Sequence, residues 1–213
     1  MVTREERLFV IEKTGCSQTV VRKLDRYVLL LEEWQKKMNL VASSTLPVVW
    51  SRHVWDSAQL ANFLKPTDKT ILDLGSGAGF PALVLACLNE KTHFFLIESD
   101  KKKCAFLQAV TEANHLQNVT VINDRIENTA SFQTDVITAR ALAPLDKLIK
   151  YALPFMAIHT RCLFMKGKKA DEELAAAQKK FLFAVEKCPS LTSGEGRILI
   201  LSKVRKNDRK HFI

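Results

Sequence analysis

Residues 71–81 of the chain are Ile-Leu-Asp-Leu-Gly-Ser-Gly-Ala-Gly-Phe-Pro, an apolar run followed by three glycines at alternate positions and a proline. The apolar run from residue 70 to residue 74 predicts a buried strand. The glycines predict a tight turn, because glycine adopts positive φ without steric cost and lets the backbone approach a ligand closely. Pro81 suits the first turn of a helix over residues 81–89, where its missing N–H would have no partner. A strand, a glycine turn and a helix in this order indicate the start of a nucleotide-binding βαβ unit.

The spacing of the glycines separates two classes of nucleotide-binding loop. Dinucleotide-binding loops carry G-x-G-x-x-G, whereas Gly75, Gly77 and Gly79 form G-x-G-x-G, with Asp73 two residues before the first glycine. This pattern resembles motif I of methyltransferases that use S-adenosylmethionine, a ligand without phosphates. A purely structural glycine turn and a dinucleotide loop are the alternatives to that interpretation.

The rest of the chain alternates predicted strands and helices. The predicted strands cover residues 93–97, 119–122, 136–138, 161–165, 181–187 and 197–204, and the predicted helices cover residues 101–114, 145–156 and 170–180. This alternation predicts an α/β fold with a doubly wound, mostly parallel seven-stranded sheet. Two consecutive strands at the end predict an antiparallel hairpin. The arrangement resembles the Rossmann-like sheet of class I S-adenosylmethionine-dependent methyltransferases, whose last strand is antiparallel.

Residues 1–65 are predicted to form a helical extension, and residues 66–213 the Rossmann-like domain. Ser17 is a candidate N-cap, and apolar residues then recur at spacings of three or four up to Leu40. This spacing predicts an amphipathic helix of roughly 22 residues. We interpret its apolar stripe as part of the core. Shorter helical pieces are predicted from there to Phe63.

In open α/β sheets, ligands bind beyond the carboxyl ends of the strands, so the residues after each strand are candidates for a site. Asp73 and the glycine loop follow the first strand. Glu98 follows the second, where a carboxylate can accept both hydroxyls of a ribose; its alternative role is an N-cap, which Asp100 fits better. Residues 123–127 follow the third strand, where an adenine edge is commonly held. Glu127 is either a cofactor contact or a solvated acid.

Two cations at the same edge are the candidate catalytic residues. Arg140 follows the fourth strand within an apolar segment, and a buried charge without a partner is costly. Lys166 follows the fifth strand, next to Gly167. His53 and Asp56 are three residues apart and are predicted to share a helix face. They lie either beside the target pocket or in a hydrogen bond or cap between the extension and the sheet.

The composition excludes several classes of protein. No apolar run reaches the ~18 residues of a transmembrane helix, and the N-terminus lacks the apolar segment of a signal peptide. Five cysteines without a C-x-x-C pair indicate free thiols in a reducing compartment, so we expect a cytoplasmic protein without a metal site. The net charge is +9, and residues 161–213 hold thirteen Lys and Arg against six Asp and Glu. That excess predicts a nucleic-acid partner, unless it serves only solubility.

Several stretches together resemble one family, the ribosomal RNA small-subunit methyltransferase G family, also called glucose-inhibited division protein B. They are Arg52-His53-Val54-Trp55-Asp56-Ser57, residues 72–81, Phe106-Leu107, Arg125-Ile126-Glu127, Ala139-Arg140-Ala141, Ala143-Pro144-Leu145 and Lys166-Gly167. The first of these stretches and the one around Arg140 are more specific than the glycine motif.

The resemblance implies an enzyme that methylates N7 of one guanosine in 16S rRNA. Its cofactor is then S-adenosylmethionine, its partner is 16S rRNA or the small ribosomal subunit, and we expect a monomer. The alternatives are a methyltransferase for a protein or a small molecule, and a non-catalytic RNA-binding assembly factor. The resemblance implies cofactor contacts at Gly75, Phe80, Ile126, Glu127 and Arg140, the last close to the reacting centre. With the residues after the strands, the expected cofactor site comprises Asp73, Gly75, Gly77, Gly79, Phe80, Glu98, Ile126, Glu127 and Arg140.

Overall fold

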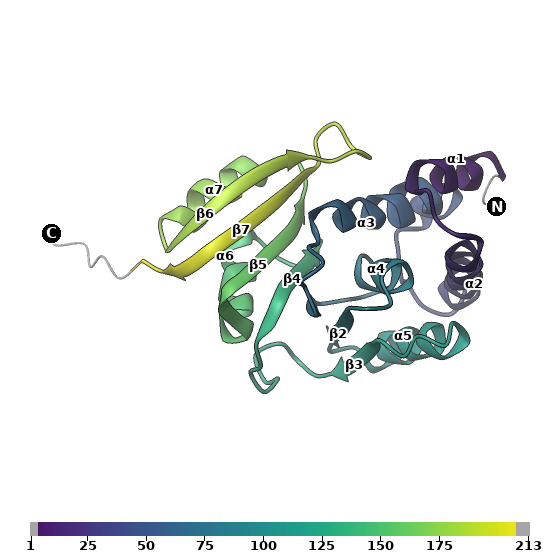
Figure 1. The fold of residues 1–213 in the computed structure, drawn as a ribbon, viewed down its shortest axis with the longest axis horizontal. Helices are drawn as coiled ribbons and strands as arrows, with labels where there is room; N and C mark the ends of the chain where they lie inside the picture. Colours follow the sequence, from purple (N-terminus) through teal and green to yellow (C-terminus); the bar gives the residue numbers. More distant parts are fainter. Residues whose placement is uncertain (1–3, 208–213) are drawn as a thin grey trace, which may run out of the picture.

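The computed structural model describes residues 4–207, and its centre is a seven-stranded sheet in the order β3-β2-β1-β4-β5-β7-β6 (Figure 1). Strands β1 to β5 pair in parallel, whereas β7 is antiparallel to both β5 and β6. This topology confirms the predicted doubly wound sheet and its antiparallel hairpin. The strands are β1 (Thr70–Leu74), β2 (His93–Glu98), β3 (Val119–Asn123), β4 (Thr134–Arg140), β5 (Met156–Lys166), β6 (Phe181–Pro189) and β7 (Arg197–Lys206).

The central strands are buried on both faces, which accounts for their continuous apolar runs. In β1, Ile71 packs into the core on one face, and Leu72 and Leu74 pack into the core on the other. Helices α2, α4 and α5 cover the first face, and α6 and α7 cover the second. The helical segments are α1 (Arg4–Thr14), α2 (Gln18–Gln35), η1 (Ser43–Val48), η2 (Trp50–Trp55), α3 (Asp56–Ala58), η3 (Gln59–Phe63), α4 (Ala82–Leu88), α5 (Lys101–Ala113), α6 (Leu145–Ala152), η4 (Leu153–Phe155) and α7 (Ala170–Gln178).

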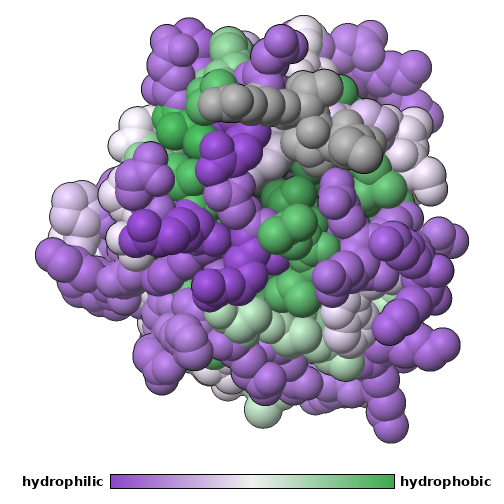
Figure 2. Space-filling model, turned by 90° about the vertical axis from the view of Figure 1, so that its right-hand side faces the viewer, coloured by the Kyte–Doolittle hydropathy of each residue, from purple (hydrophilic) through white to green (hydrophobic). Residues whose placement is uncertain are grey.

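The N-terminal helices share a core with the sheet. The buried residues of α2 form the predicted apolar stripe and are Val21, Leu24, Tyr27, Val28 and Leu31. On the side of the molecule that carries these helices, most side chains are hydrophilic, around a narrower hydrophobic band (Figure 2). The hydroxyl of Tyr27 donates to the carbonyl of Ala78 in the glycine loop, and its ring stacks on Phe80 at a centroid distance of 5.0 Å. The predicted extension therefore supports the glycine loop directly, and the domain boundary near residue 65 stays a prediction.

Helix α2 begins as predicted and ends earlier. Ser17 is its N-cap and accepts a hydrogen bond from the N–H of Val20. The helix ends at Gln35 instead of near residue 40, because the Gln35 side chain binds the returning chain. Its Oε1 accepts from the N–H groups of Leu40 and Val41, at 2.9 and 3.0 Å. The amphipathic spacing continues beyond Gln35, but the hydrogen bonds of one side chain fold the backbone back.

The helix predicted over residues 145–156 is also too long. It ends at Ala152, and a short 3-10 turn that contains Pro154 leads into β5 at Met156. Pro154 has no N–H to continue the helical hydrogen bonds. Strand β5 consequently begins five residues before the predicted strand at residue 161.

The cysteines are free, as predicted, and Cys87, Cys104 and Cys162 are buried. Within residues 4–207, none of the helices combines the length and the apolar composition needed to cross a membrane. In the same part of the chain, no three His, Cys, Asp or Glu side chains are grouped so that they could hold a metal ion.

Candidate active site

A cavity of about 440 Å³ opens at the carboxyl ends of the central strands. We call it the first cavity. Its walls come from the glycine loop, from the residues after β2, β3 and β4, and from the segment that follows α2. Two predicted cofactor residues, Asp73 and Gly79, do not line it. Seven do, and they are Gly75, Gly77, Phe80, Glu98, Ile126, Glu127 and Arg140.

The glycine loop needs glycine for two different reasons. Gly75 and Gly77 have φ of +65° and +55°, in the left-handed region that other residues rarely adopt. A Cβ atom on Gly75 would lie 2.5 Å from Cδ1 of Leu142, which also lines the first cavity. A Cβ atom on Gly77, by contrast, would come no closer than 3.9 Å to the carbonyl oxygen of Gly75. Backbone conformation therefore constrains Gly77, and close packing adds to the constraint at Gly75.

Glu98 connects the end of β2 to the glycine loop. Its Oε2 accepts from the N–H of Gly77 at 2.9 Å, and its Oε1 accepts from the N–H of Asp100 at 2.8 Å. Asp100 is the N-cap of α5, since its side chain accepts from the N–H groups of Lys102 and Lys103. The predicted N-cap role of Asp100 is therefore confirmed, whereas ribose binding by Glu98 stays a prediction. Carboxylate oxygens have more than one lone pair each, so Glu98 can hold the loop and still accept from a ligand.

Asp73 lies beneath the loop rather than in the wall of the cavity. Its Oδ1 accepts from the Thr138 hydroxyl at 2.6 Å, and its Oδ2 is buried without a hydrogen-bond partner. Burial raises the pKa of Asp73 to about 6, against the opposing effect of the hydrogen bond from Thr138. Asp73 joins β1 to β4 at the point where both strands reach the site.

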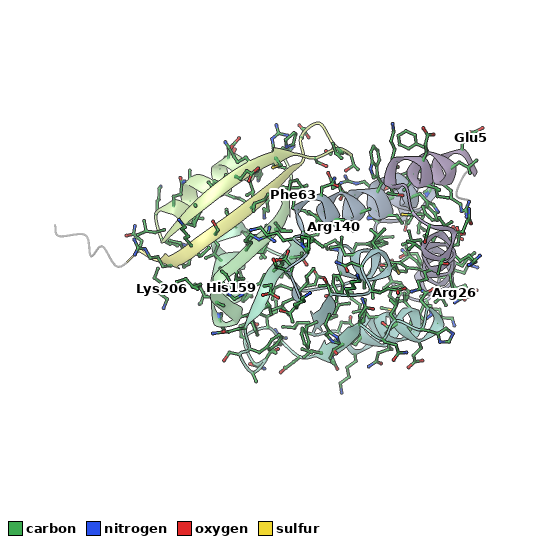
Figure 3. All side chains as sticks on the ribbon, viewed as in Figure 1. Glu5, Arg26, Phe63, Arg140, His159 and Lys206 are labelled. Atoms are coloured by element: carbon green, nitrogen blue, oxygen red, sulfur yellow. The ribbon has the colours of Figure 1, made fainter. Side chains whose placement is uncertain are left out.

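Arg140 ends β4 and lies near the middle of the molecule (Figure 3). Its Nη1 is 3.3 Å from Oδ2 of Asp56, and its Nη2 is 2.9 Å from Nδ1 of His53. The guanidinium carbon lies 5.1 Å from the centroid of the Phe80 ring. Burial lowers the pKa of Arg140, and the charge of Asp56 opposes that shift. The partners of this half-buried cation are therefore His53 and Asp56, the pair for which the sequence predicts, as one alternative, a hydrogen bond between the extension and the sheet.

A second cavity, of about 320 Å³, adjoins the first. Arg140 and Ala141 line both cavities, and His53, Asp56 and Lys166 line the second. Lys166 is held in place, with its Nζ 2.6 Å from Oε2 of Glu173 and 2.8 Å from the carbonyl oxygen of Ala143. Lys166 therefore lies beside the second cavity and is already engaged by an acid.

Sequence reasoning missed part of the walls. Leu40 and Val41, from the segment after α2, line the first cavity, as does Tyr151 of α6. Ala141 has a φ of +54°, which its residue type does not predict. Glycine would have marked this turn, whereas alanine gives no signal. For Tyr151, the only hint is an aromatic residue within the helix predicted over residues 145–156.

The sheet order, the glycine loop after β1 and the acid after β2 define the class I S-adenosylmethionine-dependent methyltransferase fold. Solved structures with this fold superpose on the chain at low sequence identity. Ribosomal protein L11 methylase from Lactobacillus delbrueckii subsp. bulgaricus has a TM-score of 0.58 and 13% identity, with 71% of this chain and 78% of that one covered. The AdoMet complex of TYW2 from M. jannaschii has a TM-score of 0.54 and 16% identity, with 72% and 76% covered.

The chain belongs to the rRNA small subunit methyltransferase G family, whose model matches residues 20–199. Two relatives carry the name Ribosomal RNA small subunit methyltransferase G. The protein of Paramagnetospirillum magneticum is 45% identical over 195 residues, which cover 92% of this chain and 94% of that protein. The protein of Hyphomonas neptunium is 39% identical over 209 residues, which cover 98% and 100% of the two chains. The family resemblance inferred from the sequence is thereby confirmed.

Proposed function

We propose that this protein transfers a methyl group from S-adenosylmethionine to N7 of a guanosine in 16S rRNA, in the cytoplasm. The observation that supports this best is the meeting of two cavities at Arg140 and Ala141. A methyltransferase needs one site for its cofactor and another for its acceptor, with the reacting atoms at their junction. The two cavities have that arrangement, in a chain of the rRNA small subunit methyltransferase G family.

The residues of the first cavity fit S-adenosylmethionine. Its volume of about 440 Å³ suits a nucleoside-sized ligand. Glu98 supplies a carboxylate for ribose hydroxyls, and the backbone at Gly75 and Gly77 has no side chain between it and a ligand. Ile126 offers an apolar surface to an adenine ring, and Glu127 is an exposed acid beside it. When bound, this cofactor supplies a methyl group activated by a positively charged sulfur.

Methylation at N7 of guanine requires no general base, because the lone pair of N7 is already free. The junction of the cavities is consistent with a reaction that needs no general base. Its only imidazole, within the described chain, is that of His53, and both of its nitrogens are already hydrogen-bonded. The chain's contribution is then orientation: holding the acceptor so that N7 lies in line with the methyl group. In this proposal, Arg140 holds the acceptor base or a phosphate at the junction, and Lys166 supports the same edge.

The test of this proposal is methyl transfer from labelled S-adenosylmethionine to small-subunit rRNA from cells that lack the gene, followed by mass mapping. We expect a single 7-methylguanosine. A methyl group on protein or on a small molecule would favour another acceptor. RNA binding without any heat of cofactor binding in calorimetry would favour a non-catalytic assembly factor.

We also predict which basic residues contact RNA. Arg52 and Arg197 line the second cavity, so glutamine at both positions is expected to flatten the salt dependence of RNA affinity. The slope of log affinity against log salt should change by roughly 0.7 to 0.9 for each phosphate that the variant no longer neutralises. Filter binding over a range of salt concentrations measures this slope.

The matched control is glutamine at Lys203 and Lys206, two exposed cations of β7. Lys206 lies at the end of the hairpin far from Arg140 (Figure 3), so this control should keep the wild-type slope. The opposite pattern would place the RNA surface on the basic C-terminal part, as the charge distribution alone suggests. Arg209 and Lys210 of that part lie outside the described residues.

A further inference from the structure

The guanidinium of Arg140 is fixed by residues of the N-terminal helices, more than eighty positions away in the sequence. Nη2 donates to Nδ1 of His53 at 2.9 Å. Nη1 lies 3.3 Å from Oδ2 of Asp56 and 3.5 Å from the carbonyl oxygen of Arg52. Arg140 belongs to β4, whereas the residues that it contacts belong to η2 and α3. A planar guanidinium held at both terminal nitrogens has a defined orientation.

The partners of His53 determine its tautomer. Arginine only donates hydrogen bonds, so Nδ1 of His53 is an acceptor and carries no proton. In a neutral imidazole, Nε2 then carries the hydrogen, and it lies 2.8 Å from the hydroxyl oxygen of Thr45. That hydroxyl in turn donates to the carbonyl of Ala42 at 2.7 Å. Donors and acceptors alternate without conflict from Arg140 to Ala42.

The surroundings of His53 bury the ring and keep it neutral. The residue is 8% exposed, and its ring stacks on Phe80 at a centroid distance of 4.9 Å and an interplanar angle of 22°. Burial, together with the charges of Arg140 and Arg52, lowers the pKa of His53 to about 3. A proton on Nδ1 would turn this acceptor into a donor facing the N–H of Arg140. His53 therefore accepts from Arg140 throughout the physiological pH range.

Asp56 holds the other terminal nitrogen and is itself oriented by the β6–β7 loop. Its Oδ1 accepts from the amide nitrogen of Gln59 at 2.9 Å, from the hydroxyl of Ser190 at 3.4 Å, and from the hydroxyl of Thr192. Its Oδ2 remains for Arg140. The carboxylate thus has separate partners for its two oxygens, and the one that faces Arg140 is not shared with these neighbours.

We propose that His53 is a positioning residue, which acts as a neutral hydrogen-bond acceptor to set the orientation of Arg140 at the junction of the two cavities. Thr45 fixes the tautomer that makes this possible, and Asp56 fixes the second guanidinium nitrogen. This inference rests on the proposed function, because orientation of Arg140 matters only if the acceptor binds there. It assigns His53 no proton transfer.

The first test is spectroscopic and independent of activity. In wild-type protein with ¹⁵N-labelled histidine, two-bond nitrogen–proton NMR spectra at pH 7 should show His53 with the hydrogen on Nε2 and none on Nδ1. A charged ring or the Nδ1–H tautomer would overturn the proposal. The measurement needs no variant, so it decides the assignment even where a substitution prevents folding.

The second test compares two substitutions that each keep one nitrogen position of the ring. His53→Asn places its amide oxygen near the position of Nδ1 and keeps an acceptor for Arg140. His53→Gln places its amide near Nε2 and keeps only the contact with Thr45. We expect H53Q to lower kcat by about 10- to 100-fold with little change in KM for RNA, since misorientation at a reacting centre has effects of this size. H53N should retain clearly more of kcat than H53Q.

The matched control is His93→Gln. His93 also pairs its Nε2 with a threonine hydroxyl, that of Thr120 at 2.8 Å, but it lies at the opposite end of β2 from Glu98. H93Q should keep the wild-type kcat. Equal losses in H53N and H53Q would show that His53 is merely part of the packing, and would overturn the proposal. If the wild-type protein transferred no methyl group to rRNA, the proposed function would fail instead, and the NMR result would still report on His53.

Discussion

Replacing Arg140 by alanine is expected to lower kcat for methylation of 16S rRNA by about 100-fold, the effect of a misplacement of roughly 1 Å at a reacting centre. Arg140 and Ala141 line both cavities, and Arg140 is the charged one of the two. Under the proposed function, this variant lacks the group that orients the acceptor, whereas Glu98 and the glycine loop are expected still to hold the cofactor. Single-turnover kinetics with small-subunit RNA measure the change, and calorimetry should show a much smaller change in cofactor affinity.

Two further variants separate the roles of charge and geometry. Arg140→Lys keeps the charge, but an ammonium cannot reach His53 and Asp56 in the fixed geometry of a guanidinium, so its kcat should also be low. Arg140→Ala leaves Asp56 buried without its cation, which is expected to cost about 3 kcal/mol of stability. Asp56→Asn in the same chain removes that charge and should restore stability without restoring kcat. Full activity in the lysine variant would contradict the orienting role.

Much of the fold was predictable because the deciding signals are local. An apolar run with glycines and a proline marks the β1–α4 unit, and strands buried on both faces leave continuous apolar runs such as residues 93–97. The positions of Glu98 and Asp100 also indicated which of the two acids caps the next helix. Asp100 lies directly before α5 and caps it, whereas Glu98 ends the strand.

The parts that were not predictable depend on contacts between distant residues. The end of α2 is set by the Gln35 side chain and its bonds to the returning chain. Lys166 has the residue type of a catalytic cation, but Glu173 of α7 binds its ammonium. Likewise, the sequence pattern around His53 marked a specific motif without showing which residue His53 contacts. His53 contacts Arg140, and only the packing of the N-terminal helices against β4 brings these two residues together.

Replacing Gly75 by valine is expected to weaken the binding of S-adenosylmethionine by roughly 10- to 100-fold. A β-branched residue at a φ of +65° has a strain of about 1–3 kcal/mol. We expect the loop of the free protein to relieve this strain by leaving the conformation that lines the cavity, so that cofactor binding has to restore it, and each 1.4 kcal/mol then corresponds to about a tenfold change in Kd. The added Cβ also meets Leu142 at 2.5 Å and pushes it, so the wall of the first cavity moves as well. Isothermal titration calorimetry with the cofactor measures the loss.

The control for this variant is Gly15→Val, because Gly15 has nearly the same backbone conformation in a different place. Its φ is +60°, it lies between α1 and α2, and a Cβ there would have no atom within 4 Å. Both variants should lose stability in urea denaturation, since both put valine in the left-handed region. Only Gly75→Val should lose cofactor affinity, because Gly75 lines the first cavity and Gly15 does not. Equal cofactor affinities in the two variants, with both folded, would mean that the cofactor does not bind against this loop.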